Sequence, residues 1–89
     1  MSEGKSEALV AGTPREVFIC HVTVDGGLNI RTQPDTTANS QVVFTAPTGT
    51  TLNYYEKVAG QKINDINCWG HSVEDHYYWL GGTDSPWCN

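Results

Sequence analysis

Basic residues and long apolar runs are both scarce in this sequence. Five Lys and Arg stand against ten Asp and Glu among 89 residues, so the formal net charge is −5. A surface that binds nucleic acid is built from clustered Lys and Arg, which argues against nucleic acid as a partner. No apolar run approaches the ~18–20 residues of a membrane-spanning helix, so we expect no membrane partner either.

Cysteine is also sparse, and its number is odd. Cys20, Cys68 and Cys88 allow one disulfide with one free thiol, or three free thiols. If a disulfide forms, Cys68 and Cys88 are the pair we expect, because it would tie the tail to the last predicted hairpin. A zinc site built from Cys68, His71, His76 and Cys88 is disfavoured, since Cys68 and His71 would face opposite ways on a strand. We therefore expect no metal and no other cofactor.

Helical periodicity is missing as well, whereas runs rich in β-forming residues recur along the chain. These runs are residues 17–24, 28–31, 41–46, 51–58 and 76–80. Gly, Pro, Asn and Asp separate them, a pattern typical of a small barrel or sandwich. The sequence predicts one all-β domain, monomeric in isolation, over residues 16–89.

The first fifteen residues differ in composition from the rest. They are rich in Ser, Glu, Gly and Ala, and we expect residues 1–15 to be a flexible linker or tail. They also lack the apolar core of a signal peptide, so export would need a leader outside this sequence or another route.

Alternation along residues 17–24 predicts which side chains of this strand are buried. Phe18, Cys20, Val22 and Val24 share one face, and His21 lies on the other. We expect Cys20 to be a buried small apolar residue. Because neighbouring strand residues point apart, Cys20 and His21 cannot form a nucleophile–base pair.

Three motifs in order cover most of residues 17–84. The run GLNIRTQPDTTANSQVV (27–43) combines Leu-Asn-Ile-Arg, a polar turn with Pro and a Val pair. The run TAPTGTTLNYYEKVAGQKIND (45–65) has a Gly-Thr turn before a long strand, and CWGHSVEDHYYWLGGTD (68–84) is an aromatic hairpin. Together they resemble the bacterial SH3 domain family (SH3b), in the form appended to cell-wall amidases and endolysins. The chain departs from the family at Glu74-Asp75-His76, where Gly is common, and in the tail SPWCN.

The resemblance implies a fold and a function. The fold would be a small SH3-like barrel of five to seven short strands. The function would be a non-catalytic module that binds peptidoglycan peptide or glycan and targets an attached hydrolase to the bacterial envelope. Its location would be extracellular or in the cell envelope, or it would be phage-encoded and directed to the cell wall. The alternative is a protein–protein interaction or autoinhibitory module of a secreted or phage-encoded protein.

The aromatic hairpin carries the predicted ligand site. With Glu74-Asp75 as a two-residue loop, His71 would pair with Tyr78 and Trp69 with Leu80. One small barrel cannot bury all of these rings, so some should be exposed for stacking and hydrogen bonding, with Trp69 the first choice and Trp79 the second. The alternative is that the rings cover a sheet edge or an interface within the parent protein. The candidate ligand-binding residues are Trp69, Trp79, Tyr78, His76, His71, Tyr54, Tyr55 and Arg31.

Two further residue patterns bear on chemistry. Arg31 would either reach a carboxylate of a wall peptide or pair with a nearby acid to hold a loop. Glu74 and Asp75 are the nearest pair of carboxylates, but they fall in a predicted turn and not in a cleft as a glycosidase requires. We therefore predict that the domain is not an enzyme.

Overall fold

The computed structural model describes residues 5–10 and 13–88, with side chains from residue 16 onward. The described residues form eight strands and one short 3-10 turn, so the all-β prediction is confirmed. The elements are β1 (Lys5–Val10), β2 (Thr13–His21), β3 (Leu28–Arg31), β4 (Val42–Ala46), β5 (Thr51–Tyr54), β6 (Glu56–Ile63), β7 (Ile66–His71), β8 (Tyr77–Trp79) and η1 (Leu80–Gly82). Within this part of the chain, no helix is long and apolar enough to span a bilayer.

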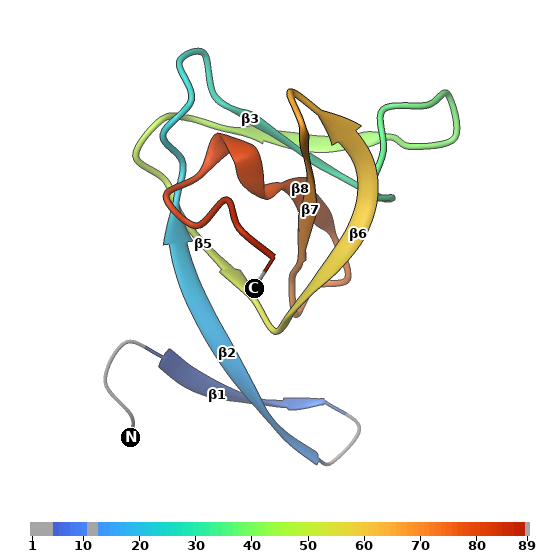
Figure 1. Ribbon diagram of the computed structural model, residues 1–89. Coiled ribbons are helices and arrows are strands. Elements are labelled where there is room, and N and C mark those ends of the chain that lie inside the picture. Colours follow the sequence, from blue (N-terminus) through green and yellow to red (C-terminus); the bar gives the residue numbers. More distant parts are fainter. Residues whose placement is uncertain (1–4, 11–12, 89) are drawn as a thin grey trace.

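The strands form two antiparallel sheets that together make an open, barrel-like body (Figure 1). One sheet has the order β1-β2-β5, and the other has the order β4-β3-β8-β7-β6. The sheets are joined at the ends of strands, where Val22 bridges Thr83 and Tyr55 N–H donates to the carbonyl of His71 at 3.0 Å. No strand pairing links β4 to β5, so the barrel is open along β4.

The N-terminal segment, which we expected to be a flexible linker or tail, contains regular secondary structure. Residues 5–10 and 13–15 have strand backbone and belong to a β1–β2 hairpin, in which Lys5 pairs with Phe18 and Val10 with Thr13. The hairpin projects away from the barrel-like body (Figure 1). Because β2 continues straight out of the barrel, β1 satisfies the backbone groups along its edge. Residues 1–4 and 11–12 lie outside the described residues, and flexibility of this segment stays a prediction.

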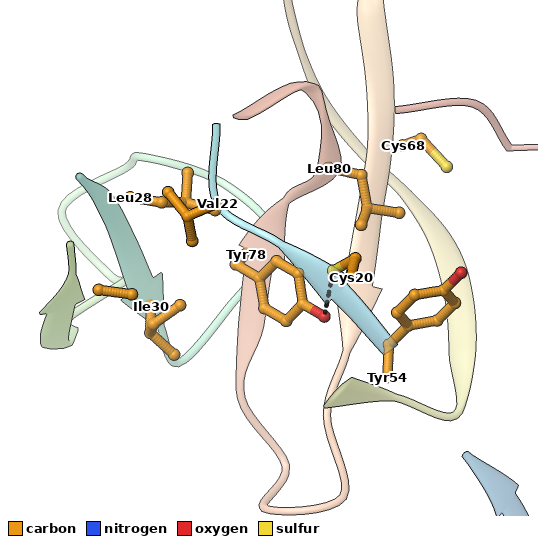
Figure 2. Packing of buried hydrophobic residues seen from close by; sticks show 9 residues of the cluster. Cys20, Val22, Leu28, Ile30, Tyr54, Cys68, Tyr78 and Leu80 are labelled. Carbon is orange, nitrogen blue, oxygen red and sulfur yellow. Dashed lines mark hydrogen bonds between the residues drawn. The ribbon is translucent and has the colours of Figure 1, made fainter. Parts of the chain in front are cut away.

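The core lies between the two sheets, and its members come from nearly every strand (Figure 2). Its buried residues are Cys20, Val22, Leu28, Ile30, Ala46, Tyr54, Cys68, Tyr78 and Leu80. Cys20 and Val22 point inward as alternation predicts, and His21 is exposed.

The prediction that Phe18 lies on the buried face of the first strand is wrong. It is 37% exposed, whereas Val17, predicted on the opposite face, is buried. Phe18 pairs with Tyr54 at the last position of the β2–β5 ladder, and the two rings stack with centroids 5.6 Å apart. Since β2 leaves the barrel at this point, Phe18 is covered by no second sheet in the described part of the chain.

Candidate functional site

The β7–β8 hairpin has a longer loop than predicted. Ser72 N–H donates to the carbonyl of His76 at 2.9 Å, which leaves Val73, Glu74 and Asp75 in the loop. Asp75 has φ of 67°, in the left-handed region. A left-handed final residue is usual in a three-residue hairpin loop, and Asp adopts this conformation more readily than most residues.

This extra loop residue shifts the strand register by one, so the predicted pairing is wrong. The observed pairs are Trp69–Trp79, Gly70–Tyr78 and His71–Tyr77. A one-residue shift changes which side chains share a face. Gly70 therefore makes room for Tyr78 and not for Trp79: a Cβ on Gly70 would lie 2.8 Å from the Tyr78 ring.

Trp69 is buried, with 1% of its surface exposed, so the prediction that it contacts solvent is wrong. Strand β6 is strongly curved (Figure 1), and the carbonyl of Gln61 on this strand accepts a 2.9 Å hydrogen bond from the indole Nε1 of Trp69. Gly60 permits this close cover, because a Cβ there would lie 2.7 Å from Trp69 Cδ1 and 2.4 Å from the carbonyl oxygen of Pro34. Trp69 is thus covered by the preceding strand β6.

Tyr78 is buried at 1% exposure, although it was also predicted to be at the surface. Its hydroxyl donates to the carbonyl of Asn53 at 2.7 Å and lies 3.5 Å from the Cys20 thiol (Figure 2). Burial raises the pKa of Tyr78 well above its ordinary value, and burial likewise raises the pKa of Cys20. Both groups therefore stay protonated in the core at neutral pH.

His71 and Tyr55 belong to a polar network, and neither lines the two pockets described below. His71 Nδ1 lies 2.7 Å from Glu56 Oε2 and 2.8 Å from the Tyr55 hydroxyl, while Nε2 lies 2.7 Å from Asp75 Oδ1. The imidazole also stacks on Tyr77 with centroids 4.2 Å apart. These contacts tie the β7–β8 loop to the start of β6.

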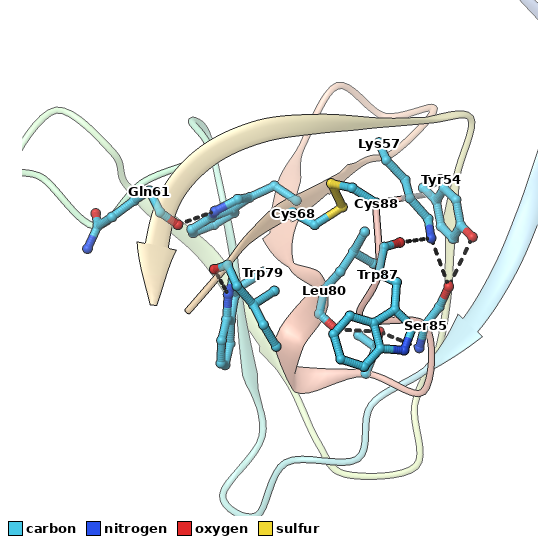
Figure 3. Close-up of a disulfide and its surroundings, with 12 residues drawn as sticks. Tyr54, Lys57, Gln61, Cys68, Trp79, Leu80, Ser85, Trp87 and Cys88 are labelled. Atoms are coloured by element: carbon cyan, nitrogen blue, oxygen red, sulfur yellow. Dashed lines mark hydrogen bonds between the residues drawn. A yellow bond between two sulfur atoms is a disulfide. The ribbon is translucent and has the colours of Figure 1, made fainter. Parts of the chain in front are cut away.

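The tail is attached to the barrel by the Cys68–Cys88 disulfide, which confirms the predicted pair (Figure 3). Lys57 reinforces this attachment, since its ammonium donates to Ser85 Oγ at 3.2 Å and to the carbonyl of Trp87. Tyr54, a candidate ligand residue, is buried at 8% exposure beneath this tail and lies 3.3 Å from Ser85 Oγ. Cys20 remains a free, buried thiol.

The larger pocket, of about 330 Å³, opens where β4 and β5 are not paired. Its lining comprises Ile30, Phe44, Thr50, Thr51, Leu52, Asn53, Ser72, Glu74, His76 and Tyr78. Phe44 pairs with Ile30 and so points to the interior side of its sheet, yet it is 49% exposed. An interior-facing ring is left uncovered here because, among the strands that the structure describes, none pairs with the outer edge of β4.

Two of the polar side chains that line this pocket are those of His76 and Glu74. Among the described residues, none hydrogen-bonds or pairs ionically with the imidazole of His76 or the carboxylate of Glu74. His76 is thus one predicted site residue that lines this pocket. Phe44 and Asn53 were missed, although the run Val42-Val43-Phe44 gave a signal: apolar residues on both faces of a strand exceed what one core covers.

The remaining predicted residues lie at a separate, smaller pocket. Arg31, Trp69 and Trp79 line a space of about 220 Å³, and Trp79 is half-buried there. Arg31 does not pair with a nearby acid, because its guanidinium donates to the carbonyl of Ser40 at 3.2 Å and joins none of the ion pairs among the described residues. The other alternative, that Arg31 reaches a carboxylate of a wall peptide, stays a prediction. The eight predicted residues are therefore divided among two pockets, the core and the His71 network.

Within the described part of the chain, no group of three or more His, Cys, Asp or Glu side chains is arranged to hold a metal ion.

Comparisons with known protein families, curated proteins and solved structures found no match to this chain.

Proposed function

We propose that this domain is a non-catalytic binding module that attaches a cell-wall hydrolase to peptidoglycan, with the larger pocket receiving peptide or glycan. The observation that carries the proposal is Phe44, an interior-facing ring left 49% exposed at the open side of the barrel. Exposed apolar surface rimmed by polar groups is typical of a ligand-binding site.

The pocket combines two kinds of contact that a wall polymer needs. Phe44, Ile30 and Leu52 offer apolar surface on which the face of a sugar ring or a peptide unit packs. The imidazole of His76 and the carboxylate of Glu74 have no hydrogen-bond partner among the described residues, so these side chains are available to bind hydroxyl and amide groups. Because the chain carries a net charge of −5, recognition depends on shape and hydrogen bonds and not on attraction to wall polyanions.

The cysteines support an extracellular or envelope location and a role without thiol chemistry. A structural disulfide such as Cys68–Cys88 persists in oxidising compartments and is rare in the cytosol. Cys20 is buried, and burial raises the pKa of its thiol, which disfavours the nucleophilic thiolate. The module would act by raising the local concentration of an attached enzyme at its insoluble substrate.

The edge strand β4 favours a second candidate, a protein–protein interaction module. Val42 and Val43 are 45% and 44% exposed on a strand whose outer edge pairs with no other strand among the described residues. An exposed apolar edge is suited to the addition of a strand from another protein. In this case the module would position subunits of the parent protein or inhibit a neighbouring domain.

Cosedimentation with purified sacculi tests the first candidate. Phe44→Ala and His76→Ala should each weaken binding by roughly tenfold, the scale of a moderate contact residue at an interface. Phe18→Ala and His21→Ala are matched controls, because both side chains are exposed away from the pocket, and they should bind normally.

Three outcomes would contradict the proposal. Absence of sacculus binding by the folded wild-type domain would favour the protein–protein alternative. Equal binding by Phe44→Ala and wild type, with unchanged melting temperatures, would place the ligand elsewhere. Loss of sacculus turbidity caused by the domain alone would show that it is an enzyme.

A further inference from the structure

The smaller pocket is separate from the larger one and shares none of its lining residues. It lies between the loop that follows β2, strand β3 and the curved strand β6. Its lining comprises Val24, Gly27, Leu28, Asn29, Arg31, Thr36, Ile63, Trp69 and Trp79. A space of about 220 Å³ is below the ~300–1,000 Å³ typical of a whole small-molecule site, so it suits one end of a ligand.

Arg31 gives this pocket a positive charge with free hydrogen-bond donors. Its guanidinium donates one 3.2 Å bond to the carbonyl of Ser40, and it joins no ion pair among the described residues. The bond to Ser40 holds the guanidinium in place and leaves most of its N–H donors unused. None of the lining residues is acidic, although the chain as a whole is. A planar guanidinium in this state is suited to bidentate binding of a carboxylate.

Asn29 adds a second donor on the same strand as Arg31. Its side-chain oxygen accepts a 2.8 Å hydrogen bond from Thr45 Oγ1, which fixes the amide group. The amide nitrogen makes no hydrogen bond among the described residues, so it can donate to a carbonyl next to the bound carboxylate.

Trp79 supplies a fixed apolar wall. Its indole Nε1 donates to the carbonyl of Ile66 at 2.8 Å (Figure 3). The six-membered ring lies against Gly81, where a Cβ would be 2.2 Å from Trp79 Cζ2. The ring is therefore held at both ends, and together with Ile63 it forms a preformed apolar surface in the pocket.

We propose that the smaller pocket binds the C-terminal residue of a peptide, with its free carboxylate on Arg31, its preceding carbonyl on Asn29 and a small apolar side chain against Trp79. The inference goes beyond the proposed function, because it concerns a different pocket and a defined end group. It applies equally if the parent protein binds another protein and not the cell wall.

The wild-type domain tests this without any substitution. N-acetyl-alanyl-alanine is titrated into ¹⁵N-labelled protein, and the indole Nε1–H of Trp79 is followed by NMR. We expect a saturable shift, and binding at least tenfold weaker for the C-terminal amide of the same peptide, because the amide lacks the charge that Arg31 binds. Propionate, a carboxylate without a peptide carbonyl, should also bind at least tenfold more weakly. Equal binding of the amide or of propionate would overturn the proposal.

Variants then assign the site. Arg31→Gln should abolish the shift and Arg31→Lys should weaken it, since lysine keeps the charge but lacks the planar pair of donors. Lys62→Gln is the matched control, because it removes the same charge from an exposed position outside the pocket. Unchanged titration of folded Arg31→Gln would refute the assignment. Phe44→Ala should bind N-acetyl-alanyl-alanine normally, so failure of this site is distinguishable from failure of the larger pocket.

Discussion

Replacing Trp69 by alanine should destabilise the domain severely, in contrast to the mild effect expected of an exposed ligand-binding ring. Trp69 is 1% exposed, and its indole is bonded to the carbonyl of Gln61. A buried Trp removes about 150–250 Å² from water, which at about 25 cal/mol per Å² corresponds to roughly 4–6 kcal/mol. Truncations of this kind typically cost about 3–5 kcal/mol, and we expect a loss in that range. Such a loss is a large part of the ~5–15 kcal/mol by which domains are stable.

Trp87→Ala is the matched control for this experiment. Trp87 is 66% exposed, and its contact with Lys57 is made by the backbone carbonyl, which the substitution keeps. Its free energy of unfolding should change by no more than about 0.5 kcal/mol. Urea denaturation followed by far-UV circular dichroism compares the two variants without relying on tryptophan fluorescence. If Trp69→Ala costs no more than Trp87→Ala, the packing of β6 over Trp69 is wrong.

Three further predictions follow from the cysteines and from Asp84. The double variant Cys68→Ser/Cys88→Ser should lose about 3 kcal/mol of stability in urea denaturation, the loop-closure value for a bridge of this span; no loss relative to wild type would contradict the pairing. Native Cys20 should react slowly with iodoacetamide and rapidly in urea, because it is buried and burial raises its pKa; rapid labelling of the folded protein would refute its inward facing. The His21 backbone N–H, bonded to the carboxylate of Asp84 at 2.8 Å, lowers the pKa of Asp84 from its ordinary 3.8. The ionised Asp84 carboxylate therefore stabilises the folded state above pH 3.8, and this stabilisation is lost as the pH falls through the lower pKa of the folded state. The melting temperature of Asp84→Asn should accordingly fall less steeply below pH 4 than that of wild type. Parallel acid titrations of the two proteins would contradict this.

Local pattern was sufficient for the fold class and for part of the core. Alternation along residues 17–24 places Cys20 and Val22 inside and His21 outside, because successive strand residues must face opposite ways. The recurrent turn residues and β-rich runs predict an all-β domain, since each acts over a few neighbouring residues. Pairing of Cys68 with Cys88 was favoured from their place in the chain, but the sequence alone left free thiols as an alternative.

The candidate site depended on contacts that no local pattern specifies. Glu74-Asp75 fits a two-residue loop as well as part of a longer one, and the left-handed backbone of Asp75 selected the longer loop and changed which rings share a face. Trp69 is buried because Gly60 and Gln61 fold over it, and Phe44 is exposed because no strand pairs with the outer edge of β4 in the described structure. The sequence by itself therefore determined that the chain forms strands and that this hairpin is rich in rings. Only the tertiary structure decided which rings are covered, because coverage depends on segments that approach from elsewhere in the chain.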